Sequence, residues 1–169
     1  MTTKMYANIF LRKSITAALL AIAAVLLGAC STTREVLNLD TSAVVTIKAR
    51  NNINPDRDGR PSPVAIRVFA LSDDRQFRRE DFLTLYEDAA ERLGRDLVDT
   101  FQLKALAPGE TREEVLALTP EVSFIGFMAE YLQYDHSDAE PLLILPLTPH
   151  KKNKYEIQAE WVKILNANE

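Results

Sequence analysis

The sequence predicts a mainly β domain, a two-sheet β-sandwich with one inserted amphipathic helix. Apolar residues recur at every second position in seven short segments, which is the period of a strand with one buried face. One further segment repeats its apolar residues at helical spacing. The chain has 169 residues and is 47% hydrophobic, so it can bury one core of ordinary size. Short strands separated by turn signals, with one helix among them, favour a sandwich.

The first three predicted strands each place apolar residues on one face. Arg67 projects from the opposite face of the second strand, where the sequence leaves its role open. The residues predicted to face inward are Ala43, Val45, Ile47 and Ala49 in the first strand, Val64, Ile66, Val68 and Ala70 in the second, and Leu97, Phe101, Leu103 and Ala105 in the third.

Four more strands are predicted after the turn at residues 107–110, where Pro108 and Gly109 occupy the central positions. The fourth covers residues 112–119. The fifth covers residues 122–131 and is apolar on both faces, which predicts a central position. The sixth covers residues 142–147, and Pro146 predicts a sheet edge. The seventh covers residues 154–165, with Tyr155, Ile157, Ala159 and Trp161 facing inward.

The inserted helix is predicted from apolar residues that recur three and four positions apart. They are Phe82, Leu85, Tyr86, Ala89, Ala90 and Leu93. Gly94 follows as the residue that ends the helix. The opposite face is rich in acidic residues and is therefore unsuited to a lipid surface. We expect the apolar stripe to pack against the core.

Residues 1–29 have the layout of an export signal. Lys4, Arg12 and Lys13 precede an apolar run at residues 17–27, and the small residues Gly28 and Ala29 follow it. A membrane-spanning helix needs about 20 apolar residues, and this run is shorter. The segment is therefore interpreted as a signal peptide.

The four residues Leu27-Gly28-Ala29-Cys30 resemble the bacterial lipobox. This resemblance implies cleavage before Cys30 and covalent lipid attachment to it, and several acyl chains hold a protein firmly on a membrane. Ser31 follows instead of Asp, which by the enterobacterial sorting rule favours the outer membrane over the inner membrane. The predicted organisation is a signal peptide at 1–29, a lipidated N-terminus and tether at 30–42, and a β-sandwich domain at 43–169.

The composition and motifs favour a protein without catalytic activity. The net charge of −4 is unfavourable for nucleic-acid binding. The sequence contains no nucleophile elbow, zinc-protease motif, glycine-rich phosphate loop or C-x-x-C pair. Residues 54–59 match half of a calcium loop, but Ala65 stands where that loop needs a glutamate. We expect no metal, no small-molecule substrate and no cofactor other than the lipid on Cys30.

The body of the chain resembles the type VI secretion outer-membrane lipoproteins, the TssJ/VasD family. The residues that carry this resemblance are the run Arg60-Pro61-Ser62-Pro63-Val64, the later Pro108-Gly109-Glu110 and the late-strand segment Gly126-Phe127-Met128-Ala129. The order of the elements agrees as well. The resemblance implies a transthyretin-like sandwich on the periplasmic face of the outer membrane.

The same resemblance implies a partner, which is the periplasmic domain of the type VI inner-membrane subunit (TssM/IcmF-like). In the family, the loop between the first two strands contacts that partner. In this chain the loop comprises Asn52, Ile53, Asn54, Pro55, Asp56, Arg57, Asp58, Gly59 and Arg60. Ile53 supports a binding role, because a solvated loop has little use for an apolar residue.

The alternative hypothesis is a periplasmic lipoprotein of sandwich fold that binds a small ligand or a carbohydrate. Such a site requires aromatic and polar groups gathered on one exposed face. Tyr131, Tyr134 and Trp161 are the candidates, although Tyr131 and Trp161 occupy positions predicted to lie in the core.

Overall fold

The computed structural model describes residues 41–167. The predicted signal peptide, Cys30, Ser31 and most of the tether lie outside the described residues. The strands are β1 (Thr41–Ala49), β2 (Val64–Leu71), β3 (Leu97–Leu106), β4 (Thr111–Leu118), β5 (Phe124–Glu130), β6 (Leu142–Pro146), β7 (Lys152–Glu160) and β8 (Lys163–Asn166). One α-helix, α2 (Phe82–Leu93), lies between the short 3-10 turns Phe77–Arg79 and Gly94–Asp96. Within residues 41–167, no helix is long and apolar enough to cross a membrane.

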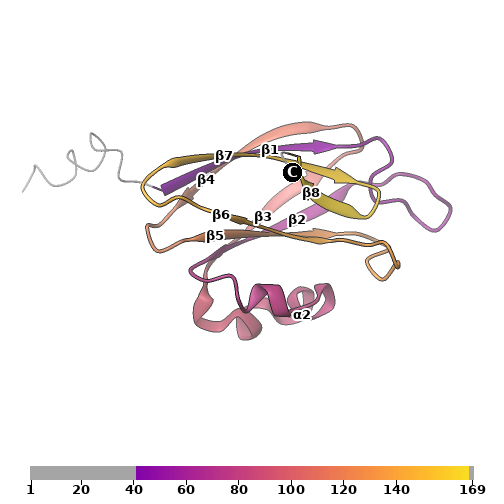
Figure 1. Ribbon diagram of the computed structural model, residues 1–169. Helices are drawn as coiled ribbons and strands as arrows, with labels where there is room; N and C mark the ends of the chain where they lie inside the picture. The colour runs from indigo at the N-terminus through magenta and orange to yellow at the C-terminus, as the bar shows by residue number, and fades with distance from the viewer. Residues whose placement is uncertain (1–40, 168–169) are drawn as a thin grey trace, which may run out of the picture. The chain divides into compact units, whose positions relative to one another are not determined.

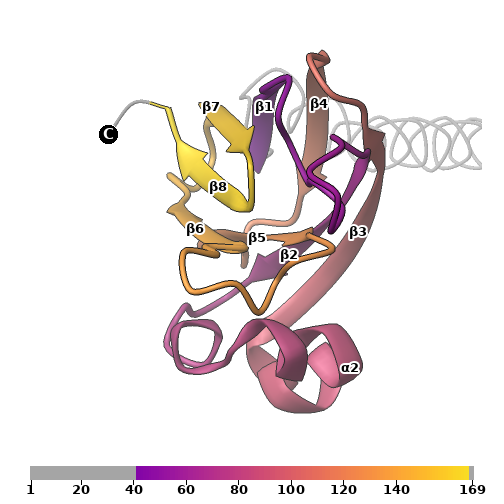
Figure 2. The ribbon, with the colours of Figure 1, turned by 90° about the vertical axis from the view of Figure 1, so that its right-hand side faces the viewer.

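The strands form two four-stranded sheets, which confirms the predicted sandwich. The strand order is β4-β1-β7-β8 in one sheet and β3-β2-β5-β6 in the other. All pairs are antiparallel except β1 with β7, which run in parallel. Strand β5 is central and β6 lies at an edge, as predicted. Helix α2 covers the outer face of the second sheet (Figures 1 and 2).

The core between the sheets contains the residues predicted for the first two strands. Ala43, Val45, Ile47 and Ala49 are all buried, and so are Val64, Ile66, Val68 and Ala70. The prediction for the third strand is wrong at both ends. Leu97 packs on the α2 side of the sheet while Val98 packs against the core between the sheets, and at the other end Ala105 is exposed and Leu106 is buried. The register between β2 and β3 shifts at each end, between Ala70 and Leu71 and between Val64 and Ile66. These irregularities move the inward face by one residue.

A second apolar layer lies between α2 and the outer face of the second sheet. Phe69, Leu71 and Met128 project from β2 and β5 and are fully buried there. Helix α2 covers them with Phe82, Leu85 and Leu93, which confirms core packing for these three positions. Asp81 caps the helix by accepting a hydrogen bond from the Thr84 N–H at 2.8 Å, and Gly94 ends it at φ +52°. Tyr86 and Ala90 differ from the prediction, since Tyr86 is 48% exposed and Ala90 is exposed as well.

The predicted seventh strand is wrong as one continuous strand. It consists of two strands, β7 and β8, which pair antiparallel from Glu160 opposite Lys163. Trp161 lies in the turn between them with φ +44°, a backbone conformation that side-chain alternation does not reveal. Trp161 is therefore partly buried in a turn and does not face inward from a strand.

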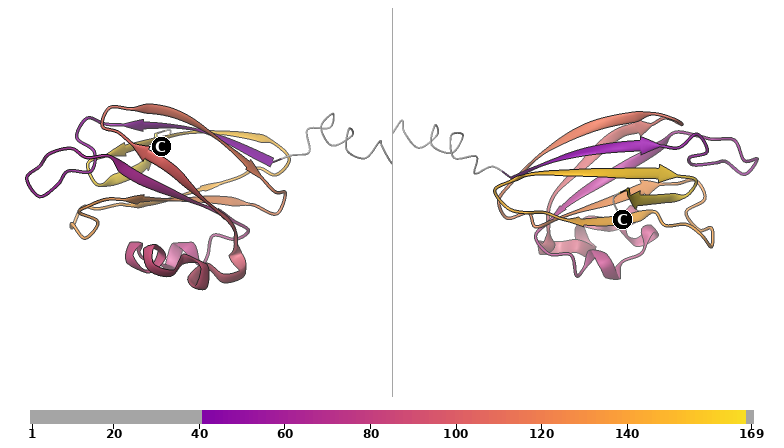
Figure 3. Two further views of the ribbon diagram at one scale, coloured as in Figure 1. Left: turned by 180° about the vertical axis from the view of Figure 1, so that it is seen from behind. Right: turned by 45° about the horizontal axis from the view of Figure 1, so that its top comes forward.

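The strand directions give the sandwich two different ends (Figure 3). At one end Thr41 pairs with Leu118 and Ser42 pairs with Lys152. We call it the Thr41 end. At the other end the β1–β2, β3–β4, β5–β6 and β7–β8 connections meet, and we call it the loop end. Strand β1 has nine residues, so the two ends lie roughly 26 Å apart.

Gly126 allows the closest approach between β5 and the turn before α2. A Cβ atom on Gly126 would lie 2.6 Å from Cε2 of Phe77, a side chain that is itself buried. We expect Gly126→Ala to displace the Phe77 ring and to lower the free energy of unfolding by about 1–3 kcal/mol, measured by urea denaturation. The double variant Gly126→Ala/Phe77→Leu should lower the free energy of unfolding by less than the sum of the two single changes. Losses of free energy that add up would contradict this contact.

Candidate functional site

Ile53 is completely buried and belongs to the core between the sheets. Ile53 therefore offers no exposed apolar contact, and core packing accounts for its presence in the loop. The sequence places polar residues on both sides of Ile53, and these surroundings give no sign of its buried position. In the structure the β1–β2 connection folds back over the end of the sandwich, and Ile53 fills that end of the core. Its role in this structure is to hold the connection in place.

Asn54 is a buried residue that fixes the shape of the same connection. It is 2% exposed and has a left-handed backbone with φ +48°. Its Nδ2 donates to the Pro63 carbonyl at 2.7 Å, and its Oδ1 accepts from the Leu132 N–H at 2.7 Å. These bonds satisfy both polar atoms of the buried Asn54 side chain, which would be costly to leave without partners. Asn54 therefore joins the β1–β2 connection to the β5–β6 connection.

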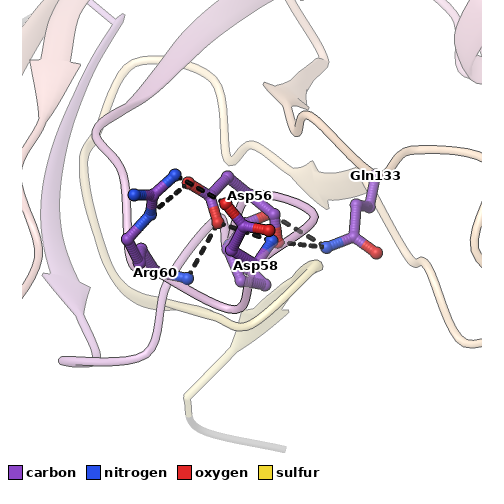
Figure 4. Close-up of polar contacts among 5 residues, drawn as sticks. Asp56, Asp58, Arg60 and Gln133 are labelled. Atoms are coloured by element: carbon purple, nitrogen blue, oxygen red, sulfur yellow. Dashed lines mark hydrogen bonds and ion pairs between the residues drawn. The ribbon is translucent and has the colours of Figure 1, made fainter.

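Residues 56–60 form the exposed tip of the predicted partner-binding loop (Figure 4). The Asp56 Oδ1 accepts from the backbone N–H groups of Asp58 and Arg60, both at 2.9 Å. The Arg60 guanidinium pairs with Asp56 and Asp58, each at 2.8 Å. Gly59 supplies the left-handed backbone of the turn at φ +80°. The tip is thus a compact turn held by its own charges.

Arg57 is the exception within the tip. It is exposed, and among the described residues it takes part in no ion pair, whereas both neighbouring carboxylates are engaged by Arg60. The tip therefore presents one uncommitted positive charge. The sequence named Arg57 as part of the loop but gave no means of separating it from the residues that shape the turn.

Gln133 connects the tip to the β5–β6 connection. Its Nε2 donates to the carbonyls of Pro55 at 3.0 Å and Asp56 at 3.1 Å (Figure 4). Together with the bond from Leu132 to Asn54, this contact makes the two connections one surface. Residues 131–134 therefore adjoin the predicted loop in space, which the sequence did not reveal.

An apolar patch lies next to this surface, between α2 and the β5–β6 connection. We define the patch as Leu83, Tyr86, Leu132 and Tyr134, which are 44%, 48%, 60% and 39% exposed. The Phe82 ring lies beneath it, stacked on Tyr86 and Tyr134 with centroid distances of 5.7 and 4.7 Å. A hollow of about 320 Å³ opens between these side chains. Exposed hydrophobic residues that gather in one place on a surface are typical of interaction sites.

Arg67 borders the patch and holds Tyr86. Its guanidinium forms an ion pair with Glu130 at 2.9 Å and lies over the Tyr86 ring, 5.5 Å from the centroid. Both charged side chains are about four-fifths buried, so solvent screens this pair less than a pair on the open surface. The sequence missed the patch because Leu83 and Leu132 are single apolar residues in polar surroundings, and Tyr86 shares the spacing of the buried helix stripe.

The aromatic residues of the ligand-binding alternative have different neighbours. Tyr131 is buried and donates its hydroxyl to the Lys163 carbonyl at 2.5 Å, and burial raises the pKa of its phenol. The Trp161 and His136 rings pack edge to face with their centroids 4.7 Å apart, whereas the Tyr134 ring stacks on Phe82. Residues 41–167 contain no group of three side chains placed to hold a metal ion.

A rigid two-sheet domain that carries an ordered loop and an exposed apolar patch at one end is typical of a binding module. The family comparison agrees with this class. The chain belongs to the type VI secretion lipoprotein family (VasD, EvfM, TssJ, VC_A0113), whose model matches residues 41–161. A comparison with curated protein sequences finds no significant match.

Solved structures show the same fold. The type VI secretion lipoprotein TssJ1 from Pseudomonas aeruginosa is 28% identical with a TM-score of 0.69, and the match covers 75% of this chain and 94% of that chain. Serratia marcescens Lip, a membrane-bound component of the type VI secretion system, is 25% identical with a TM-score of 0.69, covering 77% and 98%. A chain in a structure described as the TssM C-terminal domain from EAEC is 22% identical with a TM-score of 0.63, covering 75% and 97%, and shows the fold alone.

The Asp56 turn should depend on pH. The N–H of Arg60 is the largest cause that lowers the pKa of the Asp56 carboxyl, helped by the Arg60 side chain and the Asp58 N–H. The ionised carboxylate therefore stabilises the tip fully above the ordinary aspartate pKa of about 3.9. This stabilisation is lost as the pH falls through the lower pKa that Asp56 has in the folded protein. We expect the amide NMR signals of Asp58 and Arg60 to shift in that acidic range.

The matched control for this titration is Asp56→Asn, in which the acidic transition of both amides should disappear. A transition that persists unchanged in this variant would assign it to another group and contradict the role of Asp56.

Proposed function

We propose that this chain is an outer-membrane lipoprotein, anchored by lipid on Cys30, that binds the periplasmic domain of the type VI inner-membrane subunit. In this role it helps to assemble the trans-envelope secretion complex and carries out no catalysis. One observation carries the proposal: the charged tip at residues 56–60 and the apolar patch adjoin each other at the loop end, opposite Thr41. Membership of the type VI secretion lipoprotein family supports it.

The two ends of the sandwich suit a protein tethered at one side. Residues 31–40 separate Cys30 from Thr41, and this stretch spans at most about 40 Å when fully extended. A lipid on Cys30 therefore keeps the Thr41 end near the membrane. The loop end lies roughly 26 Å further along the domain, where a partner arriving from the inner membrane can reach it.

The chemistry of the loop end suits a protein partner. Arg57 offers a positive charge for pairing across an interface, and the apolar patch offers area to bury. The tip is ordered before binding by the contacts of Asp56 and Arg60, so little conformational entropy is lost on association. The occurrence of this fold in a structure described as the TssM C-terminal domain agrees with a partner of that kind.

Calorimetry of residues 31–169 with the periplasmic C-terminal domain of the cognate inner-membrane subunit tests the proposal. We expect saturable binding, weakened roughly tenfold or more by Arg57→Glu or Leu132→Asp. Asp56 and Asp58 are poor positions for this test because they hold the turn together. The matched control is Val115→Asp on β4, a residue that is 66% exposed and lies outside the patch.

Binding that is equally strong in all three variants would place the interface elsewhere on the domain. The absence of binding by folded wild-type protein would contradict the assembly role and favour the ligand-binding alternative.

The anchor is tested separately in cells. We expect Cys30→Ser to leave the uncleaved precursor and to remove the protein from the outer-membrane fraction, because neither lipid attachment nor processing can occur. Ser31→Asp is the matched variant, and it should remain lipidated but fractionate with the inner membrane. Normal outer-membrane fractionation of Cys30→Ser would contradict the anchor.

A further inference from the structure

A stretch rich in lysine, formed by the end of the β6–β7 connection and the first residues of β7, lies at the Thr41 end of the sandwich, far from the loop end. We call residues 150–154 the basic turn. Lys151, Lys152 and Lys154 are exposed, and none of them forms an ion pair within residues 41–167. Eight other basic side chains of that range do form ion pairs: Lys48, Arg50, Arg60, Arg67, Arg75, Arg78, Arg112 and Lys163. Three uncommitted lysines within four positions stand out in a chain of net charge −4.

The basic turn is held firmly by a buried side chain. Asn153 is 9% exposed, and the two hydrogens of its Nδ2 are shared among the carbonyls of Ser42, Thr148 and Lys151 at 3.1–3.2 Å. Its Oδ1 accepts from the Thr148 N–H at 2.8 Å. The lysines on either side of Asn153 are therefore presented from a fixed backbone.

The same contacts place the basic turn beside the start of β1. The Ser42 N–H donates to the Lys151 carbonyl at 3.2 Å, and the His150 N–H donates to Thr41 Oγ1 at 3.0 Å. Lys152 and Lys154 pair in register with Ser42 and Val44. The cluster thus adjoins the point where the chain from Cys30 enters the domain.

The carboxylates on the same face of β4 and β7 and in the β4–β5 turn form no ion pair with the basic turn. Glu156 lies on the same face but is engaged by Lys48 at 2.6 Å, and Glu113 lines the shallow hollow next to Lys152 and Lys154. Glu121, in the β4–β5 turn, is bonded to the Thr119 hydroxyl at 3.0 Å. No side chain of residues 41–167 neutralises the three lysines directly.

We propose that the basic turn binds the anionic phospholipid headgroups of the leaflet that holds the lipid anchor. This inference rests on the proposed anchor at Cys30, which keeps the Thr41 end within about 40 Å of that surface. Lysines near an anionic membrane are attracted to it, and the attraction falls off within a Debye length. Contact through the basic turn orients the domain, so that the loop end points away from the membrane and toward the partner.

The test uses the mature lipoprotein reconstituted into vesicles of phosphatidylcholine, alone or mixed with phosphatidylglycerol. An amine-reactive reagent labels exposed lysines, and mass spectrometry reports the rate at each site. We expect the anionic vesicles to slow labelling of Lys151, Lys152 and Lys154 about fivefold, and high salt to restore it. Lys104, which is exposed on β3, serves as the internal control and should be labelled at the same rate on the neutral and the anionic vesicles.

A pair of variants separates the basic turn from a general effect of charge. Lys151→Gln with Lys152→Gln leaves Lys154 as the reporter, and its slow labelling on anionic vesicles should be lost. Arg79→Gln with Arg92→Gln changes the net charge equally at exposed positions outside the turn, and Lys154 should stay slow. Equal labelling of Lys154 on the two kinds of vesicle in the wild type would overturn the proposal.

Flotation with the neutral vesicles distinguishes this failure from failure of the anchor. Protein that floats with phosphatidylcholine but shows no slowed lysines retains the anchor and overturns only the headgroup contact. Protein that does not float with neutral vesicles overturns the anchor and the headgroup contact together.

Discussion

Strands β2 and β5 are apolar on both faces, and this constraint decides where the other elements lie. Val68 and Phe127 face the core between the sheets, whereas Phe69 and Met128 face the opposite way and are equally buried. The second sheet therefore needs a cover on each side, the first sheet on one face and α2 on the other. Because α2 lies against β5, its exposed residues come next to the β5–β6 connection. The apolar patch follows from that packing.

The fold could be predicted where burial follows a simple period. Alternation located β1, β2 and β4, and short continuous apolar runs located β5 and β6. Alternation failed at Leu106 and Trp161, where a register shift and a positive φ interrupt the period without changing the composition. The site was less predictable, because Ile53 and Arg57 differ in burial for tertiary reasons. Only the packing of the β1–β2 connection separates the residues that shape the loop from those that present a surface.

The surface at each end of the domain is held in shape by side-chain amides. At the loop end, Asn54 and Gln133 join two connections into one preformed surface. At the Thr41 end, Asn153 plays the equivalent part for the basic turn. In both places a side-chain amide forms hydrogen bonds with backbone groups that have no partner in the strand pairing. The surfaces are thereby fixed to the sandwich and do not depend on a partner for their shape.

The parallel pairing of β1 with β7 has a consequence for how the chain reaches its folded state. Contacts between these strands join residues more than 100 positions apart, for example Lys48 with Glu156 at a separation of 108. Until β7 and β8 are available, β1 can pair only with β4, and one side of the first sheet stays open. Topologies dominated by such distant contacts fold slowly. The first sheet can therefore close only after the C-terminal strands β7 and β8 have joined β1, so the sandwich is completed last by the end of the chain.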